Sequence, residues 1–329
     1  DSAEVHYEDT MKGGRTNDAA LVRVLADQAD DAVEWLISLG ADLSDVGRSG
    51  GSTNNRSHRP TGGAPVGAHL VDVLSTAARD RGVTILTSTE AVEIIVEGNV
   101  VMGIKVKDES KEYSIRATSV IIATGGFGAD SEMIGQLNPA LIGFGTTNHP
   151  GANASGINMA VAIGAATVDM KEIQTHPTVE VTSGEMITEA VRGNGAILVN
   201  MEGQRFVNEL GTRDVVSEAI LAQTEKTSFL LFRDEIRESL SAIEGYIKRD
   251  IVEEFETVEA LAEKFGITIE AMQETLDTYN GFVETKVDTQ FARAYFPRAL
   301  AEGKFYLIQV GPAVHHTMGG LKTDRKSVV

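Results

Sequence analysis

Residues 176–214 gather cationic and hydrogen-bond-donating side chains that could bind a small anion. The segment holds His176, Thr188, Glu189, Arg192, Arg205 and Arg213, and a second cluster, VHHTMGG, adds His315 and His316. The chain as a whole carries a formal net charge of −19. Because an acidic protein here gathers cationic and hydrogen-bond-donating groups, we expect them to form a pocket for a small anion.

The spacing of these residues leaves simpler interpretations open. Glu189 and Arg192 are three residues apart, so a helix would place them on one face, but an ordinary surface ion pair has the same spacing. His176, taken alone, could be a core histidine bonded to the backbone. The remaining histidines have no spacing typical of metal ligands, and we expect no metal site: His6, His58, His69 and His149.

Length and composition restrict the number of domains and the class of protein. A chain of 329 residues favours two domains. With 42% hydrophobic and 23% charged residues it is typical of a soluble globular protein. Its acidity argues against nucleic acid or an anionic membrane surface as a partner, and no apolar run approaches the ~20 residues of a membrane span. The absence of cysteine excludes disulfides and leaves the compartment open.

Apolar periodicity predicts helices at residues 16–40 and 67–81. We expect Asn17 or Asp18 to cap the first helix and its single tryptophan, Trp35, to lie in the core.

The stretch between these helices, residues 44–63, is polar and glycine-rich and is predicted to be a loop. It could be a solvated loop. Alternatively, it could contact a phosphate or a flavin through the backbone N–H groups of Thr61, Gly62 and Gly63.

Alternating and continuous apolar runs predict strands at 83–87, 91–106 (a hairpin), 113–117 and 119–128. The last of these, SVIIATGGFG, ends in a glycine-rich turn, and open α/β sheets bind ligands at such strand ends. Residues 146–165 read as a glycine- and asparagine-rich loop followed by a helix, which Asn153 or Ser155 could cap.

The composition changes near residue 171. We predict a hairpin at 196–208, a helix at 214–223, a strand at 228–232, mostly helix at 233–282 with Thr257 as one N-cap, and a strand at 304–310. This pattern indicates a separate α+β domain.

Six segments in this order form a recognisable pattern: SHRPTGG, ATGGF, QTHPT, MITEAVRGNGAILVN, GQRFVNELGTRD and VHHTMGGL. The chain resembles the flavoprotein family of fumarate reductases and succinate dehydrogenases. Within that family it is most similar to the soluble fumarate reductases, including the flavocytochrome c type.

The resemblance implies an α/β FAD-binding domain with an α+β capping domain inserted into it. The FAD-binding domain would comprise residues 1–170 and 315–329, and the capping domain residues 171–314. The family's N-terminal G-x-G-x-x-G motif and its C-terminal segment are missing, so we expect an incomplete FAD-binding domain. A fragment of this kind should bind FAD weakly or not at all and be inactive alone.

The resemblance also implies roles for the anion-binding residues. Hydride passes from FAD N5 to one alkene carbon of fumarate, and Arg213 donates a proton to the other carbon. Glu189 and Arg192 match the relay that reprotonates it. The expected substrate contacts are His176, Thr188, Glu189 and His315. An arginine, with a pKa normally above ~12, can act as the acid only beside a strong developing base.

FAD is expected to be bound non-covalently. The implied contacts are Ser57, His58, Arg59, Thr61, Gly62, Gly63, Ala91, Val92, Ala123, Thr124, Gly125, Ser155 and His316. Ser155 departs from the aspartate that relatives usually have there. The electron donor could be haem, FMN or a reduced flavin domain, and the compartment could be cytoplasmic or periplasmic.

Three alternatives stay open. The substrate could be another enoate of the urocanate, acrylate or cinnamate type, although small Thr175 and Ala190 offer nothing to recognise an imidazole ring, which favours fumarate. The enzyme could oxidise succinate. From a different class, the chain could be a non-catalytic interaction module.

Overall fold

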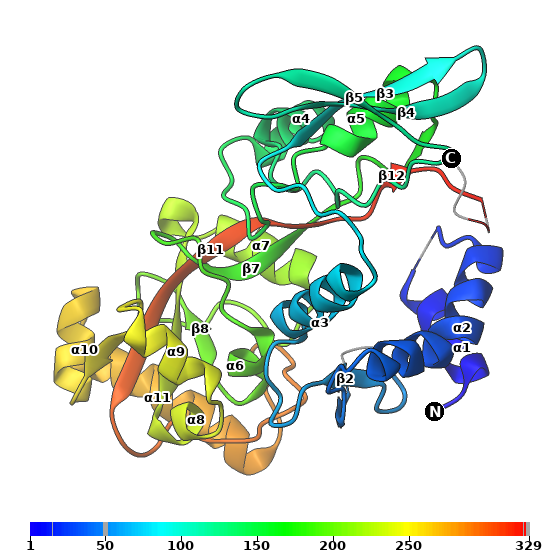
Figure 1. Cartoon of the computed structure of the whole chain (residues 1–329). Helices are drawn as coiled ribbons and strands as arrows, with labels where there is room; N and C mark the ends of the chain where they lie inside the picture. Colours follow the sequence, from blue (N-terminus) through cyan, green and yellow to red (C-terminus); the bar gives the residue numbers. More distant parts are fainter. Residues whose placement is uncertain (15, 49–51, 325, 327–329) are drawn as a thin grey trace. The chain divides into compact units, whose positions relative to one another are not determined.

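The computed structural model describes residues 1–14, 16–48, 52–324 and 326, and the chain divides into two units (Figure 1). The first contains residues 1–120 and the short segment after residue 321, and the second contains residues 121–321. No helix in the described part of the chain combines the length and apolar character needed to cross a bilayer.

The first unit combines helices with two small antiparallel sheets. Its helices are α1 (Ala3–Gly13), α2 (Ala19–Ser38) and α3 (Val66–Asp80). One sheet pairs β1 (Asp45–Gly47) with β2 (Ser57–Arg59), and the other has the order β3 (Glu90–Glu97), β4 (Val100–Lys107), β5 (Glu112–Arg116). The predicted hairpin is confirmed, and Gly98 makes its turn with φ +64°.

Helix α2 shows both the strength and the limit of the helical periodicity. Asp18 is the cap, because its Oδ1 accepts from the N–H groups of Ala20 and Leu21. The prediction that Trp35 lies in the core is wrong, since 56% of this residue is exposed. Ala26 is one of the helix's two buried residues, and nine positions later the helix has turned by about 180°, which places Trp35 on the opposite face.

Three predictions in the first 130 residues need correction. The stretch 44–63 is not entirely loop, because β1 and β2 pair within it; residues 49–51 lie outside the described residues. Residues 83–87 and 119–128 are not strands, and Ile121 is 90% exposed. A strand needs a neighbour to accept its backbone hydrogen bonds, and no described strand pairs with either segment.

The second unit is built on a five-stranded antiparallel sheet. Its longest strand, β11 (Phe305–Thr317), pairs with β9 (Ser228–Arg233), β10 (Glu253–Phe255) and β7 (Ile173–Glu180), and β8 (Ile197–Val199) extends the sheet beyond β9. Figure 1 shows β11 and β7 side by side. The predicted strand 304–310 therefore continues through both histidines of VHHT. A two-stranded ladder joins β6 (Thr167–Val168) to β12 (Gly320–Leu321).

The helices of the second unit are α4 (Ser131–Leu137), α5 (Ser155–Ala162), α6 (Glu189–Gly193), α7 (Arg213–Leu221), α8 (Asp234–Glu238), α9 (Ala242–Lys248), α10 (Val258–Phe265) and α11 (Ile269–Thr285), with 3₁₀ turns η1 (Pro139–Leu141) and η2 (Thr224–Lys226). Thr257 caps α10 as predicted. The mostly helical prediction for 233–282 missed β10. The 196–208 hairpin is reduced to one strand, β8, and a single bridge from Val199 to Arg205.

Continuous apolar runs form the centre of this sheet. Strands β8 and β9 are buried along nearly their whole length, and β11 is buried from Phe305 to Ile308. Side chains of α7, α10 and α11 join them in one hydrophobic cluster. Helices α6 and α7 are anchored in this core, and the candidate site lies where they begin.

Truncating a side chain in this core should cost far more than truncating a matched exposed one. Ile197 is completely buried, so Ile197→Ala should lower the free energy of unfolding by about 2–5 kcal/mol. Ile142, in the same unit, is 70% exposed, and Ile142→Ala should change it by at most about 0.5 kcal/mol. Urea denaturation of both variants measures the difference. Equal losses would contradict the assignment of the core.

Candidate active site

The antiparallel pairing of β7 with β11 brings the two sequence clusters together. Ala313 lies opposite His176, and His316 lies opposite Gln174, with register irregularities on either side of Ala313 and Val314. As a result the rings of His176 and His315 are 5.2 Å apart, edge to face. The six residues His176, Thr188, Glu189, Arg192, Arg213 and His315 are called here the His–Arg cluster. All six lie in the second unit.

The carboxylate of Glu189 lies between two guanidinium groups. Its Oε1 accepts from Arg213 Nε at 3.0 Å and from Arg192 Nη2 at 3.4 Å, and its Oε2 accepts from Arg213 Nη2 at 3.1 Å. The hydrogen bond and charge of Arg213 lower the pKa of Glu189, against the opposing effect of burial. Glu189 is therefore ionised at neutral pH and can accept a proton from either side.

Two helix starts place these groups. Thr188 is the N-cap of α6, and its Oγ1 accepts from Ala190 N at 3.4 Å, while its own N–H donates to the Tyr246 hydroxyl at 3.0 Å. Arg213 is the first residue of α7. Glu189 is the first residue of α6, so its carboxylate meets the Arg213 guanidinium where the two helices begin.

The side chain of Arg192 is almost completely buried. Only 3% of its side chain is exposed, and its Nη1 donates to the Glu209 carbonyl at 2.5 Å. Burial lowers the pKa of Arg192, partly offset by the charge of Glu189. A guanidinium with a lowered pKa releases its proton more readily than an exposed one.

Arg213 keeps donors free for a ligand. Its Nε and Nη2 bind Glu189, and its Nη1 donates to Gln174 Oε1 at 2.7 Å. A guanidinium has five N–H groups, so within the described part of the chain one remains on each terminal nitrogen.

The histidines are neutral donors. Burial, followed by the positive charge of Arg192, lowers the pKa of His176 to about 3. Its Nδ1 accepts from Thr178 N at 3.3 Å, so the proton of the neutral ring is on Nε2. Burial, followed by His316, lowers the pKa of His315 to about 4, and its Nδ1 lies 2.7 Å from Thr147 Oγ1.

Together these groups offer donors that suit an anion with two acceptor ends. Two guanidinium groups and one carboxylate leave the His–Arg cluster with one net positive charge in a chain of net charge −19. Neutral Nε2–H and hydroxyl donors can bind carboxylate oxygens without the cost of burying further charge. Glu189 was also predicted as a substrate contact; since both its oxygens bind arginine, this geometry favours its relay role.

The flavin contacts predicted in the second unit lie next to one another. The turn at Gly125 has φ +78°, and no atom lies within 4 Å of the position its Cβ would occupy. A Cβ at Gly156 would overlap the hydroxyl of Thr124 and a methyl group of Ile122, so the start of α5, with Ser155, packs directly on Ile122 and Thr124. Bare backbone beside a helix N-terminus suits close approach of a cofactor phosphate, so these residues fit FAD.

His316, the remaining flavin contact of this unit, is exposed. It stacks on His315 with ring centroids 4.0 Å apart. Partial desolvation, followed by the charge of Arg213, lowers its pKa.

The flavin contacts predicted in the first unit lie on β2, on the turn after it and on β3. Ser57, His58 and Arg59 form β2. The Nδ1 of His58 lies 2.8 Å from the Leu43 carbonyl, and Thr61 N donates to Asp42 Oδ2 at 2.9 Å.

Gly62 and Gly63 follow with φ +82° and +74°, a backbone form that favours glycine. Ala91 and Val92 lie at a register shift of β3, where Val92 is 37% exposed.

Sequence reasoning missed several residues of the site. Gln174 could have been found, because it lies two positions before His176 on a strand and so shares its face. Thr147 comes from an irregular loop and Tyr246 from α9. No periodic signal connects them to the site.

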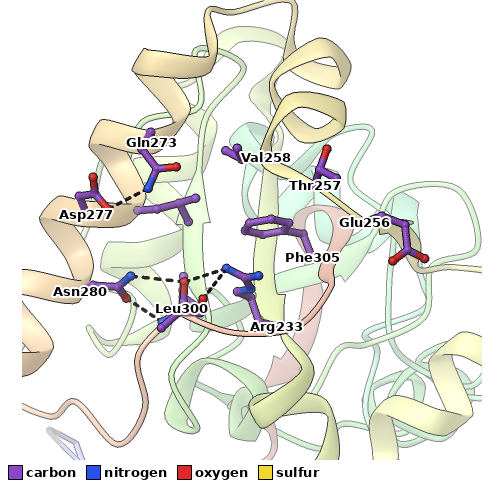
Figure 2. A pocket seen from close by; sticks show the side chains of 11 residues that line it. Arg233, Glu256, Thr257, Val258, Gln273, Asp277, Asn280, Leu300 and Phe305 are labelled. Atoms are coloured by element: carbon purple, nitrogen blue, oxygen red, sulfur yellow. Dashed lines mark hydrogen bonds between the residues drawn. The ribbon is translucent and has the colours of Figure 1, made fainter.

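A separate pocket of about 400 Å³ lies between α10, α11 and the start of β11 (Figure 2). Its arginine, Arg233, is already bound, because Nη1 donates to the carbonyls of Leu300 at 3.3 Å and Ala301 at 3.1 Å. The carboxylates of Glu256 and Asp277 also line it. This pocket is therefore poorly suited to an anion, and no residue of the His–Arg cluster lines it. Among the described residues, no group of histidine, aspartate and glutamate side chains is arranged to hold a metal ion.

Comparisons with known proteins identify the family. The family model described as FAD binding domain matches residues 1–329. The chain is 49% identical to "Fumarate reductase (cytochrome)" of Shewanella frigidimarina, over 100% of this chain and 58% of that protein. It is 43% identical to "NADH:fumarate oxidoreductase" of Klebsiella pneumoniae, over 98% of this chain and 35% of that protein.

Among solved structures, the open conformation of a flavocytochrome c3 fumarate reductase matches with a TM-score of 0.87 and 39% identity, over 99% of this chain and 58% of that one. The chain therefore belongs to the FAD binding domain family, and the predicted resemblance and the FAD-binding fold are confirmed. It spans little more than half the length of the Shewanella relative.

The buried neutral state of His176 should appear as a pH dependence of stability. Its folded pKa of about 3 is below the ordinary value of 6.5, so between these values the unfolded chain binds more protons. The contribution of His176 to the free energy of unfolding is therefore complete above pH 6.5. It falls as the pH drops, by up to about 1.4 kcal/mol per pH unit. His176→Gln should flatten the slope by that amount. Urea denaturation of the wild type and of His176→Gln across this pH range measures the two slopes. Identical slopes would show that burial does not lower the pKa of His176.

Proposed function

We propose that this chain carries the substrate-binding and proton-donating site of an FAD-dependent fumarate reductase. The observation that carries the proposal is the Arg213–Glu189–Arg192 chain of hydrogen bonds beside two neutral histidines. The names of the Shewanella and Klebsiella relatives point to the same activity.

The His–Arg cluster binds a dicarboxylate at both ends. Nε2–H of His176, the hydroxyl of Thr188 and the free nitrogen of His315 are the donors for carboxylate oxygens. Charge-assisted bonds from Arg213 add to them and strengthen as negative charge grows on the substrate.

When bound, reduced FAD would supply a hydride to one alkene carbon of the substrate. Arg213 gives a proton from a free N–H to the neighbouring carbon, which becomes basic as the hydride arrives. Glu189, bound to the same guanidinium through two hydrogen bonds, returns a proton to it. Arg192, on the buried side of Glu189, supplies that proton to Glu189, and a proton from solvent replaces it. The product is succinate with both added hydrogens accounted for.

The residues proposed to contact FAD are Ser57–Arg59, Thr61–Gly63, Ala91 and Val92 in the first unit and Ala123–Gly125, Ser155 and His316 in the second. We propose that binding is non-covalent, since His58 and His69 are both engaged in structural hydrogen bonds. The division into FAD-binding residues 1–170 and 315–329 and capping residues 171–314 is part of this proposal.

Replacing the proposed acid should remove turnover and leave the flavin in place. In the FAD-loaded protein that contains this chain, Arg213→Ala should lower kcat for fumarate-dependent reoxidation of reduced flavin by about 10²–10⁴-fold. Arg249 is a matched control, because it makes a similar 3.0 Å ion pair with Glu185 on the surface. Arg249→Ala should retain kcat.

Two other outcomes would change the conclusion. If the wild type ignores fumarate but is reoxidised by a urocanate, acrylate or cinnamate type of enoate, the mechanism stands and the substrate is wrong. If Arg213→Ala keeps its kcat, the acid is another group. A colourless protein that reduces no enoate would favour a non-catalytic interaction module.

A further inference from the structure

A buried network of ion pairs contacts helix α6, which carries Glu189 and Arg192 of the proposed relay. It consists of Arg205, Glu209, Asp288 and Arg293, each at most 8% exposed. Glu209 accepts from Arg205 at 2.8 and 2.9 Å and from Arg293 at 3.0 Å, and Asp288 accepts from Arg205 at 2.9 Å. None of these four side chains belongs to the His–Arg cluster.

Arg293 ties this network to helix α6. Its Nη2 donates to the Arg192 carbonyl at 2.9 Å and its Nη1 to the Ala196 carbonyl at 3.0 Å. Its Nε donates to the Tyr295 carbonyl at 3.0 Å. One guanidinium thus holds both sides of the turn that follows α6.

Helix α6 needs such a support. It has five residues, too few to be stable through its own hydrogen bonds. Its last carbonyls have no partner inside the helix. The Arg192 carbonyl accepts from Gly195 N at 3.2 Å and, at a shorter 2.9 Å, from Arg293. A shift of α6 would move Glu189 and Arg192 together relative to Arg213, which starts a different helix.

Glu209 contributes in a second way. Its carboxylate is occupied by Arg205 and Arg293, so Arg192 binds its main-chain carbonyl instead, at 2.5 Å. Among the described residues, this leaves Glu189 as the one carboxylate hydrogen-bonded to Arg192. The network therefore directs Arg192 toward the relay and away from a competing buried charge.

We propose that Arg293, paired with Glu209, is a positioning residue that fixes α6 and so aligns Arg192 and Glu189 with Arg213. The expected effect of this positioning on kcat rests on the proposed function. Lysine cannot replace Arg293, because its single ammonium group cannot reach carbonyls and a carboxylate in three fixed directions.

The test compares Arg293→Lys with Arg233→Lys in the FAD-loaded protein. Arg233 is a matched control, since its guanidinium also donates to three main-chain carbonyls, those of Leu300, Ala301 and Gly303, and does not touch α6. Arg293→Lys should lower kcat with fumarate about 10–10²-fold, the range for misplaced catalytic groups. KM and flavin content should change less than about threefold, and the solvent deuterium isotope effect on kcat should rise.

Amide hydrogen exchange of residues 189–193 gives a second readout that needs no activity. Exchange there should speed up in Arg293→Lys and stay unchanged in Arg233→Lys. Glu209→Gln, which keeps the side-chain shape, should reproduce the effect if Arg293→Lys does not fold. The proposal is overturned if Arg293→Lys keeps both kcat and protection, or if both lysine variants lose them equally. If the wild type does not reduce fumarate, the proposed function fails and hydrogen exchange alone decides the positioning role.

Discussion

The site depends on one carboxylate shared by two guanidinium groups. Glu189 fixes Arg213 through two hydrogen bonds and contacts Arg192 through a third. A carboxylate between two cations stays ionised, and each cation stays charged beside it. This arrangement keeps two arginines close together without repulsion dominating, and it leaves free N–H groups on Arg213 for a substrate.

The fold brings this ion group to the histidines through a single long strand. Strand β11 has its first half in the hydrophobic core and its second half against β7, so His315 and His176 meet although 139 positions separate them in the sequence. Burial keeps both rings neutral, which concentrates the positive charge on the arginines. Val191 and Arg192 of α6 are buried as well, so a change in α6 alters both the core and the site.

Residue types in short motifs predicted the site better than the architecture around it. His176, Glu189, Arg213 and His315 could be chosen from their motifs, and the structure places them together. The role of Arg293 could not be predicted, because its partner Arg192 is 101 positions away and no local pattern connects them. The prediction of a strand at residues 119–128 was wrong for a related reason. An apolar run becomes a strand only when another segment supplies hydrogen-bond partners for its backbone.

The central claim is that Glu189 passes protons and does more than hold Arg213 in place. Glu189→Gln tests this directly, because the amide keeps the size and one acceptor but cannot carry the proton. We predict a fall in kcat of about 10²-fold or more with fumarate, a KM within about threefold and unchanged flavin content. Glu185→Gln, at the surface pair with Arg249, is the control. A Glu189→Gln protein with wild-type kcat would contradict the relay.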